Sequence, residues 1–414
     1  MIETENHPER VLIVGVQTEN ISDLKFETIM KEMKALTETA NGLPVGEITQ
    51  KLRRIDQKSV VGSGKLVDVR DFVINSDIDL VIFLNRLSPN TNMYLEEQLD
   101  VKVIDRVQLI LDIFAQRARS QAGKLQVELA QYQYLLPRVI GQGTSLSRLA
   151  GGIGTRGPGE TKLEQDRRVI RGRIHTIEKD LKQLEEHRER TRIRRQSGRE
   201  FNIGLAGYTN AGKSTLLREL TESETYVQDQ LFATLDPLTR KLEINGHDAF
   251  TITDTVGFID ELPTELIHAF NSTLEEIRFV DLLIHVVDAS HPASNMHEDT
   301  VVELLKELDM DHIPVLTVYN KIDKADPGFE PTLQPNVTIS ALDKKGIETL
   351  KQAIWDICIS NAEEFQVEIQ PEEAELLALY RQKTLIKDIE FNEEYQYYIL
   401  SGYRRRLTDI RNEE

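Results

Sequence analysis

Residues 201–214 read FNIGLAGYTNAGKS, and this stretch decides the fold. The apolar run Asn202–Ala206 predicts a buried strand, and the next eight residues fit the spacing G-x-x-x-x-G-K-S ahead of a helix that starts near Lys213. The glycines let backbone N–H groups converge on phosphates at the N-terminus of that helix. We expect Lys213 to contact the β- and γ-phosphates and the Ser214 hydroxyl to bind Mg²⁺. The residues expected to bind the nucleotide here are Gly207, Tyr208, Thr209, Asn210, Ala211, Gly212, Lys213, Ser214 and Thr215.

A second motif, Asp254-Thr255-Val256-Gly257, closes the apolar strand Phe250–Thr253. A carboxylate at a strand end beside a phosphate loop can hold Mg²⁺ through water, which assigns Asp254 to the metal. The Gly257 N–H can bond to a γ-phosphate and so report its presence. All four residues of the motif are expected to contact the nucleotide.

A third motif, Asn320-Lys321-Ile322-Asp323, follows the strand Val315–Tyr319. The Asp323 carboxylate can accept hydrogen bonds from the guanine N1–H and N2–H₂, a pair of donors that adenine lacks. Ser340-Ala341 follows the last strand, where a backbone N–H can meet the guanine O6. The motifs therefore predict GTP and GDP as ligands. The expected base-site residues are Asn320, Lys321, Asp323, Ser340, Ala341 and Leu342.

The strand and helix patterns divide the chain into four parts. Residues 201–360 repeat strand–helix units, which predicts an α/β nucleotide-binding domain with a doubly wound, mostly parallel sheet. Its strands are expected at 202–207, 238–245, 248–255, 281–290, 314–320 and 336–340. Residues 1–116 alternate apolar strands with helices such as Ser22–Ala40 and predict a small parallel α/β domain. Residues 361–414 predict a small α+β domain.

Residues 117–200 predict a helical hairpin, within a helical pattern that starts at 105 and has one interruption. One heptad seam consists of Leu125, Leu129, Tyr132 and Leu136, and another of Ile170, Ile174, Ile177, Leu181 and Leu184. Between the seams, residues 141–160 hold seven glycines and a proline, so they cannot be helical throughout. We expect a functional loop at the tip, carrying Arg148, Arg156 and Lys162.

The charge of the chain is unevenly distributed. The net charge is −19, yet residues 117–200 carry 19 Lys or Arg and 10 Asp or Glu, which makes them +9. This contrast indicates either a polyanionic partner or a solvated charged helix. No apolar run approaches the ~18 residues of a membrane span, and the start of the chain lacks the pattern of a signal peptide. Cys358 is the single cysteine, so we expect no intrachain disulfide. We also expect a soluble, cytoplasmic and monomeric protein.

In the order of its motifs, residues 201–360 resemble a translation-factor-class GTPase domain, with Leu231–Asp236 as its switch I segment. The stretch GGIGTRGPGETKLEQDRR (151–168) and the N-terminal domain extend the resemblance to HflX-type ribosome-associated GTPases of the Obg–HflX group. The resemblance implies that Thr234 is a second Mg²⁺ ligand and that Lys213, Thr234 and Gly257 serve hydrolysis. It also implies binding to the large ribosomal subunit and its rRNA, and splitting of stalled ribosomes under stress. The switch I residues implied to contact the nucleotide are Phe232, Ala233, Thr234, Leu235 and Asp236.

Some features leave alternatives open. Phe258 stands where Ras-like GTPases often place a water-orienting glutamine, so we predict slow hydrolysis until a partner orders the switches. Asn210 stands where K⁺-activated GTPases carry an asparagine, which leaves K⁺ open as a cofactor. Val61–Lys65 reads VGSGK and is either a second phosphate-binding turn, for ATP, or a plain helix start, which we favour because the Walker spacing is missing. A ribosome-assembly GTPase, an ATP-dependent RNA-remodelling enzyme and a GTP-locked scaffold are the competing functions.

The C-terminal residues and the histidines carry weaker expectations. Tyr395, Tyr397 and Tyr398 are expected to pack the C-terminal domain, and Arg404–Arg406 to lie on a solvated helix face. The histidines show no metal-binding spacing, and we assign none of them to a metal.

Overall fold

The structure is a computed structural model that describes residues 7–147, 158–196, 200–221, 231–232, 237–255, 257–259 and 277–405. The described residues form two compact units, one ending at Leu184 and the other beginning at Glu185. None of the helices in these ranges is long and apolar enough to cross a membrane.

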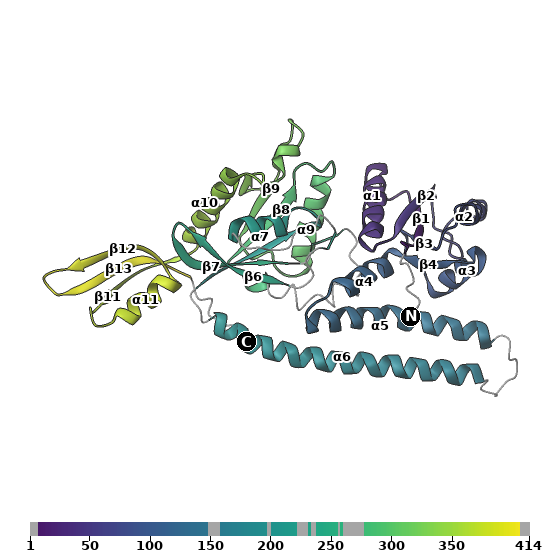
Figure 1. Ribbon diagram of the computed structural model, residues 1–414, viewed down its shortest axis with the longest axis horizontal. Coiled ribbons are helices and arrows are strands. Elements are labelled where there is room, and N and C mark those ends of the chain that lie inside the picture. The colour runs from purple at the N-terminus through teal and green to yellow at the C-terminus, as the bar shows by residue number, and fades with distance from the viewer. Residues whose placement is uncertain are drawn as a thin grey trace. The chain divides into compact units, whose positions relative to one another are not determined.

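The first unit opens with a parallel four-stranded sheet in the order β2-β1-β3-β4 (Figure 1). Its strands are β1 (Arg10–Gln17), β2 (Leu43–Lys51), β3 (Leu80–Phe83) and β4 (Lys102–Asp105). Its helices are α1 (Asp23–Thr39), α2 (Ser63–Asn75), α3 (Pro89–Leu99) and α4 (Arg106–Arg117). Residues 11–17 of β1 are all buried, as expected for a strand in a parallel sheet covered on both faces. The predicted small α/β domain is confirmed.

Helix α1 follows the predicted helix closely. The hydroxyl of Ser22 accepts the N–H of Lys25 and caps the N-terminus. Leu24 is 59% exposed, because at 3.6 residues per turn it lies on the opposite side of the helix from the buried Met33. The buried apolar residues of α1 are Phe26, Ile29, Met30, Met33 and Leu36.

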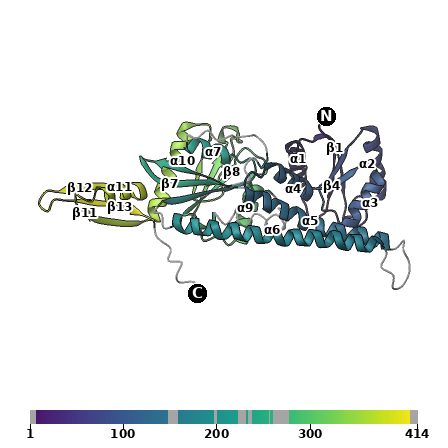
Figure 2. The ribbon, with the colours of Figure 1, turned by 60° about the horizontal axis from the view of Figure 1, so that its bottom comes forward.

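Two long helices form the predicted hairpin, α5 (Gln121–Ser147) and α6 (Pro158–Gln196). They run antiparallel and side by side in both views (Figures 1 and 2). Arg173 of α6 forms a two-point ion pair with Glu128 of α5, with Nε···Oε1 at 2.9 Å and Nη2···Oε2 at 3.1 Å. Ile177, from the predicted seam of α6, is fully buried.

The helical stretch has a break that the sequence analysis did not predict. Residues 118–120 separate α4 from α5, because Ala118 is extended and the Ser120 hydroxyl accepts the N–H of Gly123 to start a new helix. Of the predicted tip loop, Arg148 and Arg156 lie outside the described residues, and so does the side chain of Lys162.

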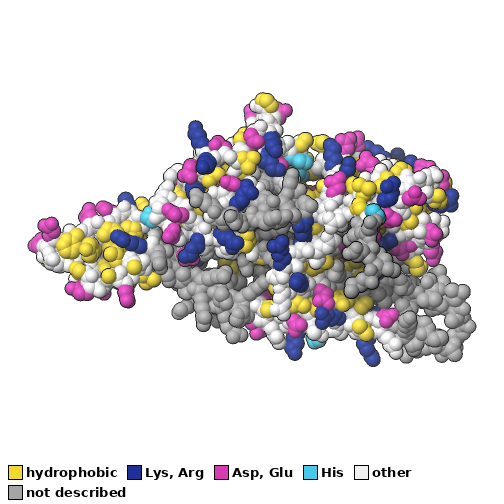
Figure 3. Space-filling view, viewed as in Figure 1, with side chains coloured by type: hydrophobic (Ala, Val, Ile, Leu, Met, Phe, Trp, Pro, Cys, Tyr) yellow, Lys and Arg dark blue, Asp and Glu magenta, His cyan; other side chains and the backbone are white. Residues whose placement is uncertain are grey.

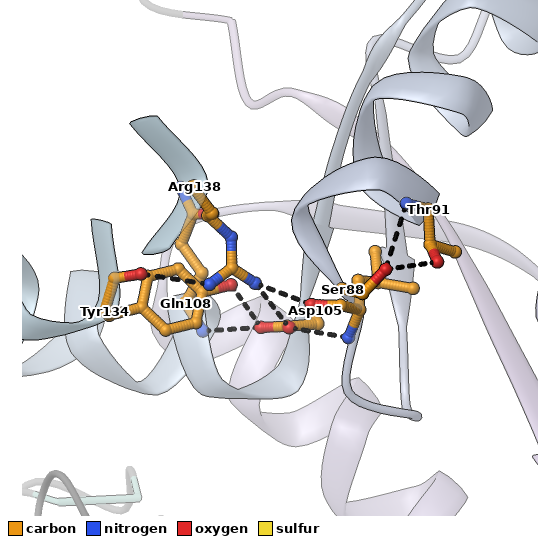
Figure 4. Close-up of polar contacts among 7 residues, drawn as sticks. Ser88, Thr91, Asp105, Gln108, Tyr134 and Arg138 are labelled. Atoms are coloured by element: carbon orange, nitrogen blue, oxygen red, sulfur yellow. Dashed lines mark hydrogen bonds and ion pairs between the residues drawn. The ribbon is translucent and has the colours of Figure 1, made fainter. Parts of the chain in front are cut away.

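Helix α5 is anchored to the sheet through Asp105, at the end of β4 (Figure 4). The Asp105 carboxylate is fully buried and accepts the hydroxyl of Tyr134 at 2.7 Å and the guanidinium of Arg138 at 3.0 Å, both from α5. It also accepts the N–H groups of Gln108 and Leu87, each at 3.0 Å. A buried carboxylate is stable only with several donors, and the two donors from α5 among these four fix α5 against the sheet. The sheet and α5 therefore pack as one unit.

The second unit contains a six-stranded sheet in the order β10-β9-β8-β5-β7-β6, parallel except for the edge strand β6 (Figure 1). Its strands are β5 (Phe201–Gly207), β6 (Leu238–Ile244), β7 (His247–Asp254), β8 (Leu282–Asp288), β9 (Val315–Asn320) and β10 (Asn336–Thr338). Its described helices are α7 (Lys213–Thr221), α9 (Ser294–Glu307) and α10 (Lys344–Ser360), with the short 3₁₀ turns η1 (Ile277–Phe279) and η2 (Ile322–Lys324). All six predicted strands are present, and the predicted fold class is confirmed.

The C-terminal residues form a separate antiparallel sheet in the order β11-β13-β12. Its elements are β11 (Glu363–Ile369), α11 (Ala374–Lys383), β12 (Leu385–Asn392) and β13 (Tyr397–Arg404). Hydrophobic side chains gather on the surface of this sheet among acidic ones (Figure 3). The exposed large hydrophobic residues of this part are Leu376, Leu379, Phe391 and Tyr395. The predicted small α+β domain is confirmed.

Two expectations about this part were wrong. Tyr398 packs on Phe391, with ring centroids 4.9 Å apart, but Tyr395 is 64% exposed because it lies in the turn between β12 and β13. Arg404 lies on a strand and pairs with Glu363 at 2.9 Å, so it is not on a helix face. Arg405 pairs with Asp281 at the start of the central strand β8, and Arg406 lies outside the described residues.

Candidate GTP-binding site

The phosphate loop joins β5 to α7 and is held in place by its own lysine. Lys213 is 6% exposed, and its Nζ donates to the carbonyl oxygens of Gly207 and Tyr208, both at 2.9 Å. A Cβ at Gly207 would collide with the backbone of β8, and one at Gly212 would collide with the side chain of Asn320. These two glycines let the loop lie directly against its neighbours.

The ammonium group of Lys213 is a buried charge. Burial lowers the pKa of Lys213 to about 8, while the Asp254 carboxylate acts in the opposite direction. His285, on β8, is 1% exposed, and burial together with the charge of Lys213 lowers its pKa to about 4. Neither ring nitrogen of His285 has a hydrogen-bond partner among the described residues. At neutral pH this corner therefore combines one ammonium group with a neutral imidazole.

Two side-chain oxygen atoms, from Ser214 and Asp254, lie close together. The Ser214 hydroxyl donates to Asp254 Oδ2 at 2.7 Å, and Asp254 is fully buried. Thr255 follows and is fixed by a bond from its Oγ1 to the carbonyl oxygen of Leu205 at 2.7 Å. A hydroxyl and a carboxylate are the hard oxygen donors that Mg²⁺ prefers, so these residues fit the implied metal. The third expected ligand, Thr234, lies outside the described residues.

The segment after Asp254 is hydrogen-bonded to the phosphate loop. Phe258 donates its N–H to the carbonyl oxygen of Gly207 at 3.1 Å, and its carbonyl oxygen accepts the N–H of Thr209 at 2.7 Å. A Cβ on Gly257 would lie 3.0 Å from Lys213 Nζ and 3.0 Å from Thr209 Cα. Gly257 therefore lies against the loop in a place that has no room for a side chain.

Asn320 links the phosphate loop to the base-recognition segment. Its Nδ2 donates to the carbonyl oxygen of Ala211 at 2.9 Å, and its Oδ1 accepts the N–H of Ala341 at 2.9 Å. The Ala341 N–H, suggested above for the guanine O6, is thus engaged inside the protein, and the contact with O6 stays a prediction.

Lys321 makes a second link to the phosphate loop. Its Nζ donates to the carbonyl oxygen of Asn210 at 2.8 Å and pairs with Asp288 Oδ2 at 2.7 Å. Asp288 was not among the predicted site residues, although its position at the end of a buried strand, like that of Asp254, is a signal that indicates it. His285 was missed as well, and its signal is a single polar residue within the apolar run LLIHVV.

A cavity of about 590 Å³ opens next to the Asn320–Asp323 motif. Asp323, Ser340 and Leu342 are among the residues that line it. Asp323 is exposed, and so is Leu342, at 71%. Three of the six expected base-site residues thus line one cavity, and Asn320, Lys321 and Ala341 are not among its lining residues.

Of the remaining expected site residues, two lie within the described ranges and the others lie outside them. Phe232 is 2% exposed and has a φ of 55°, and Thr215 is half-buried in the first turn of α7. The expected residues that lie outside the described ones are Ala233, Thr234, Leu235, Asp236 and Val256.

The N-terminal stretch Val61–Lys65 leads into helix α2, so the helix start is present, while the choice between a plain helix start and a phosphate-binding turn for ATP stays a prediction. Gly62 is the N-cap, and its N–H donates to Gln50 Oε1 at 2.9 Å. Lys65 pairs with Asp68, one turn further along the helix, at 2.9 Å.

Three family models match consecutive parts of the chain. Residues 27–115 match the model described as GTP-binding GTPase N-terminal, and residues 117–195 match GTP-binding GTPase Middle Region. Residues 202–321, which contain the site described above, match 50S ribosome-binding GTPase.

Curated relatives match nearly the whole chain. The GTPase HflX of Alkalihalophilus pseudofirmus is 45% identical over 403 residues, which cover 97% of this chain and 95% of that protein. The GTPase HflX of Caldanaerobacter subterraneus subsp. tengcongensis is 47% identical over 86% of this chain and 82% of its own length. That of Escherichia coli is 41% identical over 86% of this chain and 85% of its own length. With this identity over most of its length, the chain belongs to the HflX family of GTPases.

Proposed function

We propose that this GTPase is a nucleotide-controlled switch that acts on the large ribosomal subunit and its rRNA, and that it splits or rescues stalled ribosomes under stress. The observation that carries the proposal is the pairing of Phe258 with Gly207 and Thr209, which joins the phosphate loop to the segment that senses a third phosphate. The family description matched by residues 202–321 and the net charge of +9 in residues 117–200 support the ribosome as the partner.

In this proposal each site residue has one task. Lys213 holds the β- and γ-phosphates, and the Gly257 N–H bonds to the γ-phosphate. Ser214 would hold Mg²⁺, Asp254 would hold it through water, and Thr234 would be a further ligand. Mg²⁺, when bound, neutralises charge that develops on the phosphates.

We expect slow hydrolysis in the isolated protein. Phe258 is 2% exposed, and its ring has no group that could orient a water molecule by hydrogen bonding. A ribosome that orders the switch segments would therefore raise the rate. Asn210 further suggests a K⁺ requirement, which a comparison of hydrolysis rates in KCl and NaCl would test; equal rates would dismiss it.

The hairpin is the proposed output element. Its helix α6 exposes the basic residues Arg168, Arg171, Lys179 and Lys182. Exposed cations of this kind bind RNA phosphates and release counterions, so the affinity should fall steeply with salt.

Sedimentation with isolated ribosomal subunits tests the proposal. The chain should sediment with the large subunit when a non-hydrolysable GTP analogue is bound, and remain free with GDP. Light scattering of intact ribosomes should then show dissociation with GTP. Sedimentation that does not depend on the nucleotide would instead favour a scaffold, and binding to immature subunits alone would favour an assembly factor.

A pair of charge reversals tests the role of the hairpin. Arg168→Glu with Arg171→Glu should weaken large-subunit binding about tenfold or more without changing GDP affinity, because both residues belong to α6 and not to residues 201–360. The matched control reverses Arg240 and Lys241, which are exposed on the edge strand β6. Equal losses in both double variants would count against the hairpin.

We place nucleotide turnover in residues 201–360 alone. Doubly wound sheets bind ligands at the carboxyl ends of their strands, and in the N-terminal sheet polar side chains at that edge already bond within the protein. Asn85 bonds to both the N–H and the carbonyl oxygen of Val16, at 2.8 and 3.0 Å, and Asp23 in the first turn of α1 pairs with Lys51 at 2.7 Å. ATP turnover that survives Lys213→Ala would contradict this assignment and favour the RNA-remodelling enzyme.

A further inference from the structure

A stack of aromatic rings lies against the phosphate loop, and no motif in the sequence indicates it. The ring of Tyr208, in the loop, lies 3.8 Å from that of His297, in α9, measured between centroids, with 9° between the ring planes. His291 adds a third ring, 4.4 Å from His297. Tyr208 and His297 are 6% and 7% exposed. We propose that His297 is a positioning residue for GTP binding and hydrolysis, acting on the phosphate loop through Tyr208.

Tyr208 connects the stack to the lysine that faces the phosphates. Its carbonyl oxygen is one of the two that accept Lys213 Nζ, and it also accepts the N–H of Ala211 at 3.3 Å. The stack holds the ring of Tyr208 against α9 and so restrains this residue within the loop, including the backbone that carries its carbonyl oxygen. The stack therefore helps to set the direction in which the Lys213 ammonium points.

The same residue also contacts the segment that contains Gly257. Tyr208 forms a short parallel bridge with Phe258, in which Gly207 and Thr209 make the two hydrogen bonds. The phosphate loop at Tyr208 is thus held both by backbone hydrogen bonds to Phe258 and by the His297 ring. Loss of the stack should disturb both the ammonium group and the Gly257 N–H, so binding and hydrolysis should both fall.

The segment that carries the two histidines supports the loop at a second point. Asp288 pairs with Lys321, which in turn donates to the carbonyl oxygen of Asn210. His291 is itself fixed by two hydrogen bonds. Its ring Nδ1 accepts the backbone N–H of Ala293 at 3.1 Å, and its backbone N–H donates to the carbonyl oxygen of Asp288 at 3.3 Å. Residues 288–297 therefore contact the phosphate loop at two points, at Tyr208 directly and at Asn210 through Lys321.

The inference rests on the proposed function, because it needs the loop to be the GTP site. An aromatic pair of this geometry contributes a factor of roughly 2 to 12 to an equilibrium constant. We expect His297→Ala to weaken the binding of GDP and of a GTP analogue by up to that factor and to lower kcat. His297→Phe keeps a flat ring and should stay within about twofold of the unchanged chain.

The experiment measures the Kd of a fluorescent GDP and the kcat and KM of GTP hydrolysis in the full chain. His312→Ala, an exposed histidine after α9, is the matched control and should change neither. Tyr208→Leu and His297→Ala each break the same stack. The loss of GDP affinity in the double variant should therefore be no larger than the larger of the two single losses, because the effects of residues in contact do not add.

Three outcomes would overturn the positioning role or the site itself. A purely structural His297 would lower the unfolding midpoint of the nucleotide-free chain and leave the Kd of the folded chain unchanged. Additive losses in the double variant would likewise exclude the stack. Lys213→Ala separates the two proposals: if it binds GDP normally, the phosphate-loop assignment fails, whereas if it loses GDP while His297→Ala binds normally, only the positioning role fails.

Discussion

Asp105 and Arg138 lie 33 positions apart in the chain, and their side chains meet at 3.0 Å in the interior of the first unit (Figure 4). The Asp105 side chain is fully buried, and that of Arg138 is 15% exposed. Arg138 also donates to the carbonyl oxygen of Leu87 at 3.0 Å and covers the ring of Tyr134, with Cζ 3.4 Å from its centroid. One guanidinium group thus ties α5 to the ends of two strands of the sheet.

Replacing Arg138 with alanine should destabilise the first unit by about 3 to 5 kcal/mol, because it leaves the buried Asp105 charge without its ion-pair partner. Hydrogen–deuterium exchange of the α5 amides in the full chain measures this, and their protection should fall. The matched control is Arg173→Ala, which breaks the more exposed ion pair with Glu128. That change should cost less than about 1 kcal/mol. Equal losses of protection in the two variants would contradict the special role of Arg138.

The sequence predicted the helix α5 correctly but not the face that it buries. The heptad pattern selected Leu125 and Leu129, which are only half-buried, whereas Val127, Ala130 and Tyr134 are at most 2% exposed. A search for regularly spaced apolar residues does not find a buried helix face that includes a residue with a polar group, such as Tyr134. Its hydroxyl is satisfied only by Asp105, 29 positions away, and such a long-range partner leaves no trace in local spacing.

Nucleotide binding should take up protons at slightly alkaline pH. Burial lowers the pKa of Lys213 to about 8 in the free protein, and phosphates beside the ammonium group restore its charge. Binding of GDP should therefore take up about half a proton at pH 8 and about a tenth at pH 7. Calorimetry in two buffers with different ionisation enthalpies measures the uptake. An uptake that is the same at both pH values would contradict the assignment of Lys213.

The stability of the second unit should fall in acid because of His285. Burial lowers the pKa of His285 from 6.5 to about 4, so between these values the unfolded chain binds a proton that the folded chain does not. Stability is therefore lost as the pH falls through this window, by about 2 kcal/mol between pH 7 and pH 5. His285→Leu should remove that part of the loss.

Trp355 is a suitable reporter for this measurement. It is the single tryptophan of the chain and lies in α10, with its ring 6.1 Å from that of Phe250 in the sheet. Urea unfolding followed by its fluorescence at pH 7 and pH 5 reports on the second unit. His312→Ala, an exposed histidine, should behave like the unchanged chain, and an equal acid loss in His285→Leu would refute the prediction.

The candidate site was predictable where it follows a linear motif. Lys213 stands at a fixed place after β5, and Asp254 and Asn320 are the last residues of β7 and β9, so the structure brings all three to one edge of the sheet. The contact between Tyr208 and His297 has no such signature, because it depends on how α9 packs beside the loop. Residues that support a motif from a distant part of the chain are fixed by tertiary packing, which spacing along the sequence does not encode.

Replacing Asp323 with asparagine should shift base preference from guanine to xanthine. Asparagine offers one acceptor and one donor, so the guanine N2–H₂ loses its partner while a carbonyl group at that position gains one. We expect GDP to bind roughly 10- to 100-fold more weakly and xanthosine diphosphate to bind better, measured by competition against a fluorescent nucleotide. Asp326→Asn is the matched control, since Asp326 is exposed and accepts the N–H of Gly328. An unchanged preference for GDP in Asp323→Asn would remove this residue from base recognition.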